Sequence, residues 1–398
     1  MEIRFARRMS AVRPSTIREI LKVTEQADII SFAGGLPAPE LFPVAEVSAA
    51  CERVLREGGA GALQYGPSEG FAPLRESCAA KSRKRGIQCT ADDILITTGS
   101  QQPLDLVSKI FLDAGDCVLT ESPTYMAALQ AFQCYVVRFA AVPTDEYGLI
   151  PEALPELIER EAPKFLYTIP SFQNPTGVTL TAERRKKLYE IVARYGLIVL
   201  EDDPYGALRY AGNDIAPIKS LDTDGLVIYQ STVSKTIAPG LRIGWIVASE
   251  EIRRKLTIVK QAADLHTSSL DQRVAHRYLT DFDSDAHVER IRRAYGERFA
   301  IMDAAMRETM PEGYTWTHPE GGMFLWVTCP EGTDTCELML EALKRKVLFV
   351  PGRDFFPDAS GQRYLRLNFS NATPEQIREG IGRLAEVCRM HIEAGALS

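Results

Sequence analysis

Between about residues 90 and 250, short apolar runs alternate with stretches of helical spacing, and each run turns polar at its end. The runs are ILITTGS (94–100), CVLTESP (117–123), FLYTIPS (165–171), LIVLEDD (197–203) and LVIYQS (226–231). Continuous apolar runs of this length are typical of strands buried on both faces. The clearest helix carries apolar residues at i, i+3, i+4 and i+7 from Leu188 and ends at Gly196. The alternation predicts an α/β fold with a mostly parallel sheet covered by helices on both faces.

The pattern changes after about residue 285. GGMFLWV (321–327) and RYLRLNF (363–369) have the alternation or apolar run of strands. The last helix is expected to begin after Thr373, because Thr373 and Gln376 form a capping box and proline stands at the first helical position. The sequence therefore predicts a second, smaller α+β domain at the C-terminus.

Composition argues against several classes of protein. The 398 residues carry a net charge of −7, which disfavours a nucleic-acid surface. The eight cysteines form no CxxC pair, which favours reduced thiols and a cytoplasmic location. No apolar run approaches the roughly 20 residues of a membrane helix, and we expect no metal site. The N-terminus is rich in arginine, as transit peptides are, but it lacks their serine richness and Glu2 and Glu19 interrupt the charge. We therefore expect a basic arm that packs against some other surface.

Polar groups gather at the predicted strand ends. TTGSQQ (97–102) passes through a glycine into a helix, whose first backbone N–H groups suit a phosphate, although a serine N-cap explains the same letters. Asn174 precedes a proline, so its amide projects from an extended turn. LEDDPY (200–205) ends a strand in two acids, which are costly when buried unless something positive pairs with them, and which a solvated loop tolerates.

Lys235 and Arg242 flank a Pro-Gly turn in STVSKTIAPGLRIGW (231–245), which continues into an apolar strand. Two cations at that spacing repel unless an anion or an electrophile lies between them. Together the strand ends offer a phosphate cradle, an acid, an amide, a lysine and an arginine. Pyridoxal 5′-phosphate (PLP) needs such a set, because its aldehyde reacts with an amine, its ring nitrogen needs an anion, and its phosphate needs donors.

On these stretches the chain resembles the fold-type I PLP-dependent aminotransferases of class I/II, and within them the 2-aminoadipate and kynurenine/aminoadipate group. The shared stretches are STIREIL, SFAGGLPAPELFP, QYGPSEG, TTGSQQ, IPSFQNPTG, EDDPY, SKTIAPGLRIGW, GGMFLW and LRLNFS. The resemblance implies a large PLP-binding domain over 41–285 with a seven-stranded type of sheet. It implies a small domain over 286–398, and a segment over 1–40 that contributes to the small domain and the substrate pocket.

The resemblance also assigns cofactor roles. Lys235 is similar to the lysine that forms the Schiff base with the cofactor and moves protons. Asp202, three residues before Tyr205, would pair with the ring N–H, and Asp203 is the alternative. Tyr205 and Asn174 would bond the ring oxygen, and Tyr125 would stack on the ring. The residues implied to hold the phosphate are Ser100, Gln101, Thr232, Ser234 and Arg242, with serine also used by the family at the threonine position.

Four residues concern the substrate and the subunits. Arg366 shares one strand face with Tyr364 and Asn368, and its planar guanidinium suits an α-carboxylate; a surface salt bridge is the alternative. Arg18 resembles an arginine that reaches a distal carboxylate, or is an exposed helix charge. Gly35 lies in GGLPAP, the segment that resembles the pocket lining. Tyr65 resembles a tyrosine that reaches the neighbouring subunit's phosphate, which implies a homodimer with shared sites.

The function expected from the resemblance is ping-pong transamination from an L-amino acid to a 2-oxo acid, 2-oxoglutarate being the expected acceptor, with 2-aminoadipate-like or broad specificity. Two alternatives stay open. A PLP-dependent cysteine-conjugate β-lyase would use the same residues. A PLP-binding sensor domain of a transcription regulator would need a DNA-binding module, for which we expect no room before SFAGGLP, at Ser31.

Overall fold

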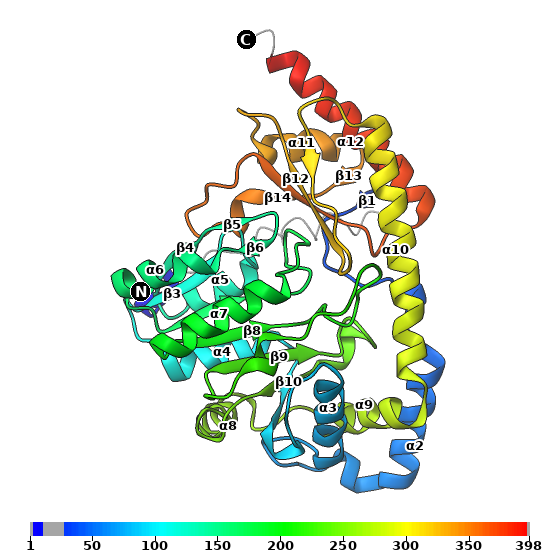
Figure 1. Cartoon of the computed structure of the whole chain (residues 1–398). Coiled ribbons are helices and arrows are strands. Elements are labelled where there is room, and N and C mark those ends of the chain that lie inside the picture. The colour runs from blue at the N-terminus through cyan, green and yellow to red at the C-terminus, as the bar shows by residue number, and fades with distance from the viewer. Residues whose placement is uncertain (1–2, 11–27, 396–398) are drawn as a thin grey trace.

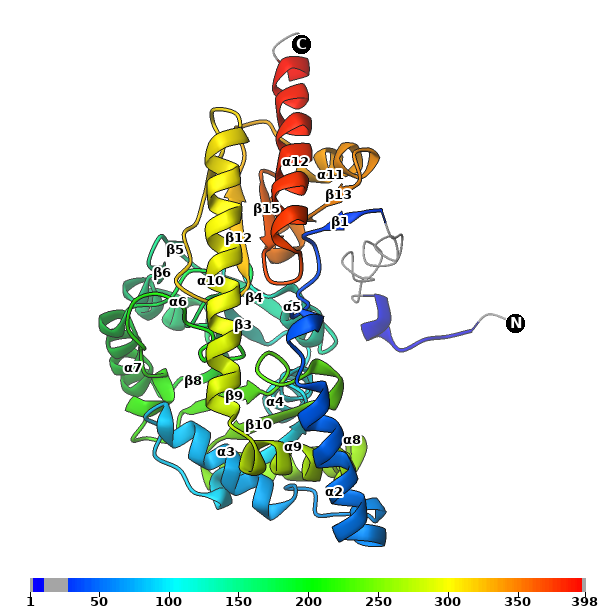
Figure 2. The same cartoon turned by 90° about the vertical axis from the view of Figure 1, so that its right-hand side faces the viewer.

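The computed structural model describes residues 3–10 and 28–395 of the chain. Within these residues, none of the helices combines the length and the apolar character that crossing a membrane requires. Two bodies of secondary structure lie end to end, and the long helix α10 (Ser284–Thr309) runs beside both of them (Figures 1 and 2).

The larger body is built on a sheet that, in the described part of the chain, has seven strands in the order β2-β10-β9-β8-β7-β3-β4. The strands are β2 (Ile94–Thr98), β3 (Cys117–Glu121), β4 (Arg138–Val142), β7 (Phe165–Thr168), β8 (Ile198–Asp202), β9 (Val227–Thr232) and β10 (Ile243–Val247). Strand β10 is antiparallel to both of its neighbours, and the other neighbouring pairs are parallel. The predicted mostly parallel sheet is therefore confirmed, and each of the five apolar runs overlaps one of its strands.

Helices cover both faces of this sheet. They are α2 (Val44–Leu63), α3 (Ala72–Lys84), α4 (Gln101–Phe111), α5 (Met126–Gln133), α6 (Leu154–Glu161), α7 (Ala182–Tyr195), α8 (Glu250–Asp264) and α9 (Ser269–Asp281). On β3, Leu119 faces the core under α6 and α7, whereas its neighbour Val118 faces the core under α4 and α5. Both faces are therefore buried, which explains why the strands show no alternation. Helix α7 ends where predicted, at Gly196, whose positive φ of 66° suits glycine.

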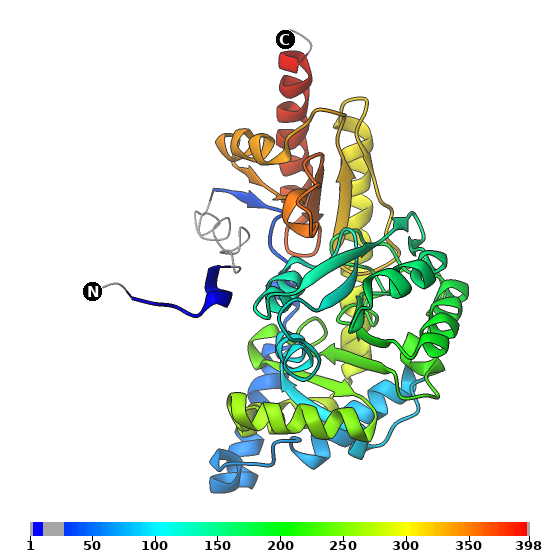
Figure 3. The same cartoon turned by 90° about the vertical axis from the view of Figure 1, so that its left-hand side faces the viewer.

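The smaller body holds a four-stranded sheet in the order β11-β12-β15-β14, all antiparallel. Its strands are β11 (Thr315–Trp316), β12 (Phe324–Thr328), β14 (Val350–Pro351) and β15 (Tyr364–Asn368), and its helices are α11 (Thr335–Lys344) and α12 (Pro374–Gly395). The predicted capping box is present, since Thr373 N donates to Gln376 Oε1 and Gln376 N donates to Thr373 Oγ1. Figure 3 shows this body seated against one edge of the larger one.

The N-terminal part of the described chain joins the smaller body. Strand β1 (Ile30–Ser31) pairs in parallel with β13 (Val347–Leu348). The chain then passes between the two bodies before α2 begins (Figure 2). A small hairpin of β5 (Thr144–Asp145) and β6 (Gly148–Leu149) completes the strands of the described residues. Because parallel strands end at one edge of the sheet, β2, β8 and β9 bring their carboxyl ends to the side that the N-terminal segment and β15 approach.

Candidate active site

Lys235 lies in the loop that follows β9. Its Nζ donates a hydrogen bond of 2.7 Å to the carbonyl of Gly35 in the N-terminal segment. Burial, followed by the positive charges of Arg366 and Arg242, lowers the pKa of Lys235 to about 8. A lysine in this environment has a substantial neutral fraction at neutral pH, as a nucleophilic amine requires.

Asp202 is the last residue of β8, and its carboxylate is buried. Its Oδ2 accepts a hydrogen bond of 2.8 Å from the hydroxyl of Tyr167. Its Oδ1 is buried and has no hydrogen-bond partner among the residues that the structure describes. Burial raises the pKa of Asp202 to about 7, while the nearby Gln230 amide and the Tyr167 hydroxyl act in the opposite direction. An unpaired buried carboxylate oxygen is unfavourable in a folded protein, so this atom fits a positively charged N–H from a bound ring.

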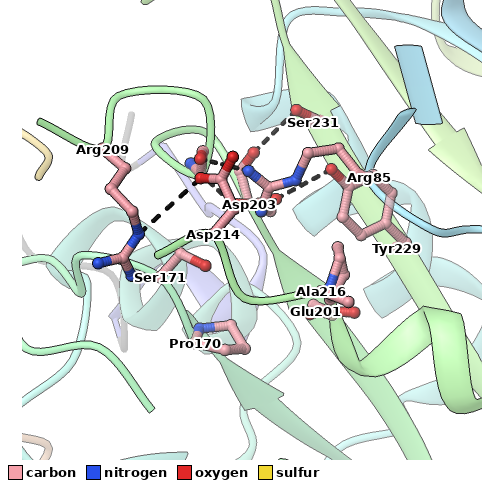
Figure 4. A network of polar contacts seen from close by, with 12 residues as sticks. Arg85, Pro170, Ser171, Glu201, Asp203, Arg209, Asp214, Ala216, Tyr229 and Ser231 are labelled. Carbon is pink, nitrogen blue, oxygen red and sulfur yellow. Dashed lines mark hydrogen bonds and ion pairs between the residues drawn. The ribbon is translucent and has the colours of Figure 1, made fainter. Parts of the chain in front are cut away.

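Both carboxylate oxygens of Asp203, in contrast, already accept hydrogen bonds. Its carboxylate accepts from the hydroxyl of Tyr229 at 3.0 Å and from Gly206 N at 2.8 Å, and Arg85 Nη2 lies 3.3 Å away. Its backbone carbonyl accepts from Ser231 Oγ. Figure 4 shows these side chains turned toward one another around Asp203. Of the two adjacent acids, Asp202 is therefore the one with an oxygen free for a ligand.

Arg366 and Asn174 meet between the two bodies. Arg366 Nη1 donates to Asn174 Oδ1 and Nη2 donates to the carbonyl of Ala33, both at 2.7 Å. Both partners are neutral oxygens, and the buried Nε has no partner in the described part of the chain. The guanidinium also lies over the rings of Phe324 and Phe355, 4.1 and 5.2 Å from their centroids. A buried cation without an acid beside it is costly, so the site is built to receive an anion.

Burial affects the pKa of Arg366 and removes it from the surface. Burial lowers the pKa of Arg366 to about 10, which leaves it charged at neutral pH. The alternative of a surface salt bridge is wrong, because Arg366 is 2% exposed and bonded to neutral groups.

The turn after β2 has the features of a phosphate cradle. Ser100 precedes α4, and Gln101 is its first residue. Gly99 has a φ of 69°, and a Cβ there would lie 2.4 Å from Arg242 Nη2. Only glycine lets this guanidinium pack so closely on the turn. Arg242 reaches the turn because β10, which follows it, pairs with β2.

Thr232 and Ser234 lie at the neighbouring strand end. Thr232 Oγ1 donates to the carbonyl of Ile243 at 2.7 Å and accepts from Ser234 N at 3.1 Å. The two hydroxyl oxygens are 2.8 Å apart. Because Ile243 takes the proton of Thr232, the Ser234 hydroxyl is the donor in the contact between the two hydroxyls. It can donate to a phosphate by rotating away from Thr232. The geometry thus gives Thr232 a supporting position.

Three tyrosines surround Asp202. Burial raises the pKa of Tyr125, and the negative charge of Asp202 raises it further. Tyr205 is buried edge-on to Phe324, and a hydrogen bond from Asn174 opposes the burial that raises its pKa. Tyr167, which bonds Asp202, is absent from the residues expected from the sequence. It lies inside the fully buried strand FLYT, where no pattern of letters separates it from a core tyrosine.

One expected residue, Tyr65, does not lie at this centre within one chain. Tyr65 is 78% exposed, and its ring meets that of His266 edge-on at 5.7 Å. Arg18 lies outside the described residues. Gly35 is at the centre, through the bond of its carbonyl to Lys235.

Comparisons with known proteins agree with this geometry. The family model described as "Aminotransferase class I and II" matches residues 28–384. The chain is 46% identical to aromatic-amino-acid aminotransferase 1 of Thermococcus litoralis, over 97% of this chain and 94% of the relative. It is 44% identical to 2-aminoadipate transaminase of Thermus thermophilus, over 97% and 96%.

Solved structures give the same result. A kynurenine aminotransferase of Pyrococcus horikoshii, in complex with PMP, superposes with a TM-score of 0.93 at 44% identity, covering 98% of this chain and 97% of that one. LysN, an α-aminoadipate aminotransferase of Thermus thermophilus complexed with N-(5′-phosphopyridoxyl)-L-leucine, gives 0.92 at 42%, covering 98% of both chains.

Proposed function

The chain belongs to the class I and II aminotransferases, and from this premise we propose how its residues divide the work of PLP-dependent transamination. It is a PLP-dependent enzyme that moves an amino group from an amino acid to a 2-oxo acid, with 2-aminoadipate-like or broad specificity. The observation that carries the proposed site is that three polar groups without a charged partner lie close together. These are the partly buried amine of Lys235, the unpaired oxygen of Asp202 and the acid-free guanidinium of Arg366.

These residues fit the cofactor. Asp202 Oδ1 would accept the ring N–H, Tyr125 would lie against the ring, and Asn174 and Tyr205 would bond the ring oxygen. Ser100, Gln101, Ser234 and Arg242 would hold the phosphate, with Thr232 supporting Ser234. When bound, PLP supplies an aldehyde that bonds covalently to amines and a ring that accepts the electron pair left at the substrate Cα.

The protein moves the protons. Lys235 Nζ binds the cofactor covalently and, once the substrate amine has displaced it, takes the proton from Cα. It later donates a proton to the cofactor carbon that carried the aldehyde. Asp202 stays ionised beside the ring nitrogen and so keeps a proton there. Arg366 grips the α-carboxylate in the bidentate geometry of a guanidinium, which orients the Cα–H toward Lys235.

Arg366→Lys is expected to raise the KM for amino acid and 2-oxo acid about tenfold to a hundredfold, because one charge-assisted hydrogen bond is lost. Steady-state kinetics with both substrates varied measures this. Arg363→Lys, on the approach to the same strand, is the matched control and should leave both KM values unchanged. An unchanged KM in Arg366→Lys would remove this residue from carboxylate binding.

Substrate choice is tested by a half-reaction panel. Single amino acids are added to the holoenzyme without a 2-oxo acid, and the loss of the visible absorbance of the bound cofactor is followed. We expect 2-aminoadipate, aromatic amino acids and kynurenine to react, as the names of the relatives suggest. No response to any amino acid would contradict transamination, and pyruvate released from a cysteine conjugate would indicate β-elimination instead.

The same panel tests Arg18. If Arg18 binds a distal carboxylate, Arg18→Ala weakens the reaction of 2-aminoadipate far more than that of leucine. Equal weakening of acidic and neutral substrates would show that Arg18 does not select acidic ones.

We also propose a homodimer in which Tyr65 reaches the phosphate of the partner subunit. The support is its 78% exposure and two further exposed apolar side chains, Leu63 two residues before it and Leu265 beside the contacting His266. The division into 1–40, 41–285 and 286–398 likewise remains a proposal, supported by the start of α10 at Ser284 and the pairing of β1 with β13. The cytoplasmic location stays a prediction.

A further inference from the structure

Lys260 of α8 is fully buried where the end of its own helix meets the start of α4. Its Nζ donates to Asp264 Oδ1 at 2.8 Å, to Gln102 Oε1 at 2.9 Å and to Thr267 Oγ1 at 3.1 Å. An ammonium has three N–H donors and is costly to bury unless they are satisfied. Burial lowers the pKa of Lys260, and the hydrogen bond to Asp264 opposes this. Asp264 and Thr267 lie at and just after the end of α8, whereas Gln102 lies in α4, so Lys260 joins the end of its own helix to the start of α4.

One side of this junction holds the phosphate cradle. Asp264 Oδ2 accepts from Thr98 Oγ1 at 2.8 Å and from Gln102 Nε2 at 2.7 Å. Thr98 N donates to Gln102 Oε1 at 2.9 Å. Thr98 and Gln102 stand on either side of Gly99, Ser100 and Gln101. The pair of Lys260 and Asp264 therefore fixes both ends of the turn that would face the phosphate.

The other side holds the segment that carries Tyr65. The carbonyl of Thr267 accepts from His266 Nδ1 at 2.8 Å and from Gln272 Nε2 at 2.7 Å. With its Nδ1 proton so used, His266 accepts at Nε2 from Gly66 N at 3.3 Å. Gln272 Oε1 accepts from Phe71 N at 2.7 Å. The exposed ring of Tyr65 rests on His266. The junction thus anchors residues 66 and 71, and with them Tyr65.

We propose that Lys260 and Asp264 are positioning residues that link cofactor binding in one subunit to association with the next. The proposal rests on the function proposed above, which places the phosphate at residues 98–102 and Tyr65 at the partner. Neither residue is among those proposed to hold the cofactor. Their ion pair holds the phosphate cradle and the Tyr65 segment in one arrangement. When bound phosphate orders the cradle, the Tyr65 segment is therefore also held in the position that contacts the partner subunit. Such a linkage acts in both directions.

The test compares Lys260→Met, Asp264→Asn and the double variant with the wild-type holoenzyme. The measurements are the rate of PLP loss on dilution, the phosphorus-31 chemical shift of the bound cofactor, and the dimer dissociation constant with and without PLP. We expect Lys260→Met to lose PLP about tenfold faster, which corresponds to about one hydrogen bond. We also expect that PLP no longer lowers the dimer dissociation constant of Lys260→Met. The double variant should lose PLP no faster than Lys260→Met does.

Lys255→Met, on the exposed face of the same helix, is the matched control and should match the wild type. If Lys260→Met does not fold, Thr98→Val removes one contact of the junction, and the same measurements apply. Unchanged PLP loss and chemical shift would overturn the proposal, as would loss of stability alone. A wild-type protein that takes up no PLP would instead contradict the proposed function.

Discussion

Replacing Lys235 by alanine is expected to lower the rate of transamination at least about 10²- to 10⁴-fold, because the substrate Cα–H loses its positioned base. The loss should be larger still if the covalent bond to the cofactor also matters for the first step. Steady-state turnover with 2-oxoglutarate measures the rate. Borohydride treatment followed by peptide mass measurement should find the cofactor fixed to position 235 in the wild type and absent from it in the variant.

A matched control separates this effect from general damage. Lys187→Ala removes an exposed lysine of α7 and should turn over like the wild type. Near-wild-type transamination by Lys235→Ala would refute the assignment, whatever the control does.

The lowered pKa of Lys235 adds a dependence on pH. With a pKa of about 8, about a quarter of the amine is neutral at pH 7.5, against roughly 0.1% at the ordinary lysine pKa of about 10.4. The neutral fraction rises as the pH rises through 8. Uptake of PLP by the cofactor-free chain should therefore quicken from pH 7 to about 8.5 and then level off, and stopped-flow absorbance would follow it.

The elements that could be predicted are those whose cause is local. Buried parallel strands need continuous apolar runs, so β2, β3, β7, β8 and β9 are visible in the sequence. The capping box of α12 and the glycine that ends α7 depend on residues a few positions apart. Strand β4, RFAAV, is half-exposed at the edge of the sheet and carries a charge, so it has no such run.

The contacts within the site were harder to predict because they join distant segments. The bond of Tyr167 to Asp202 crosses from one strand to its neighbour, and the side chain is one of four in a fully buried run. The pairing of Arg85 with Asp203 joins residues far apart in the chain. The choice of Asp202 over Asp203 rested on resemblance alone, whereas the structure supplies a physical reason. Asp203 is already satisfied and Asp202 is not.

That difference supports the second large effect. Asp202→Asn is expected to lower kcat about 10²- to 10³-fold, the usual effect of removing one preorganised electrostatic partner from an active site. The neutral amide no longer favours a proton on the ring nitrogen, so the electron pair from Cα is accepted poorly. PLP should still bind, because Lys235 and the residues around Ser100 and Arg242 are unchanged. The measurements are kcat and the cofactor content of the purified protein.

Glu121→Gln is the matched control for Asp202→Asn. Glu121 is also a buried acid at the end of a strand, and burial raises its pKa to about 8. It is therefore largely protonated at pH 7, and a glutamine can keep the bond that Glu121 Oε2 accepts from Ile169 N. The control should keep most of kcat, whereas Asp202→Asn should not.

Asp202 ionises as the pH rises through about 7 in the cofactor-free chain, so PLP affinity should rise across that range in the wild type. Asp202→Asn should lose this rise, and a variant that kept both kcat and the pH dependence would show that another group protonates the ring.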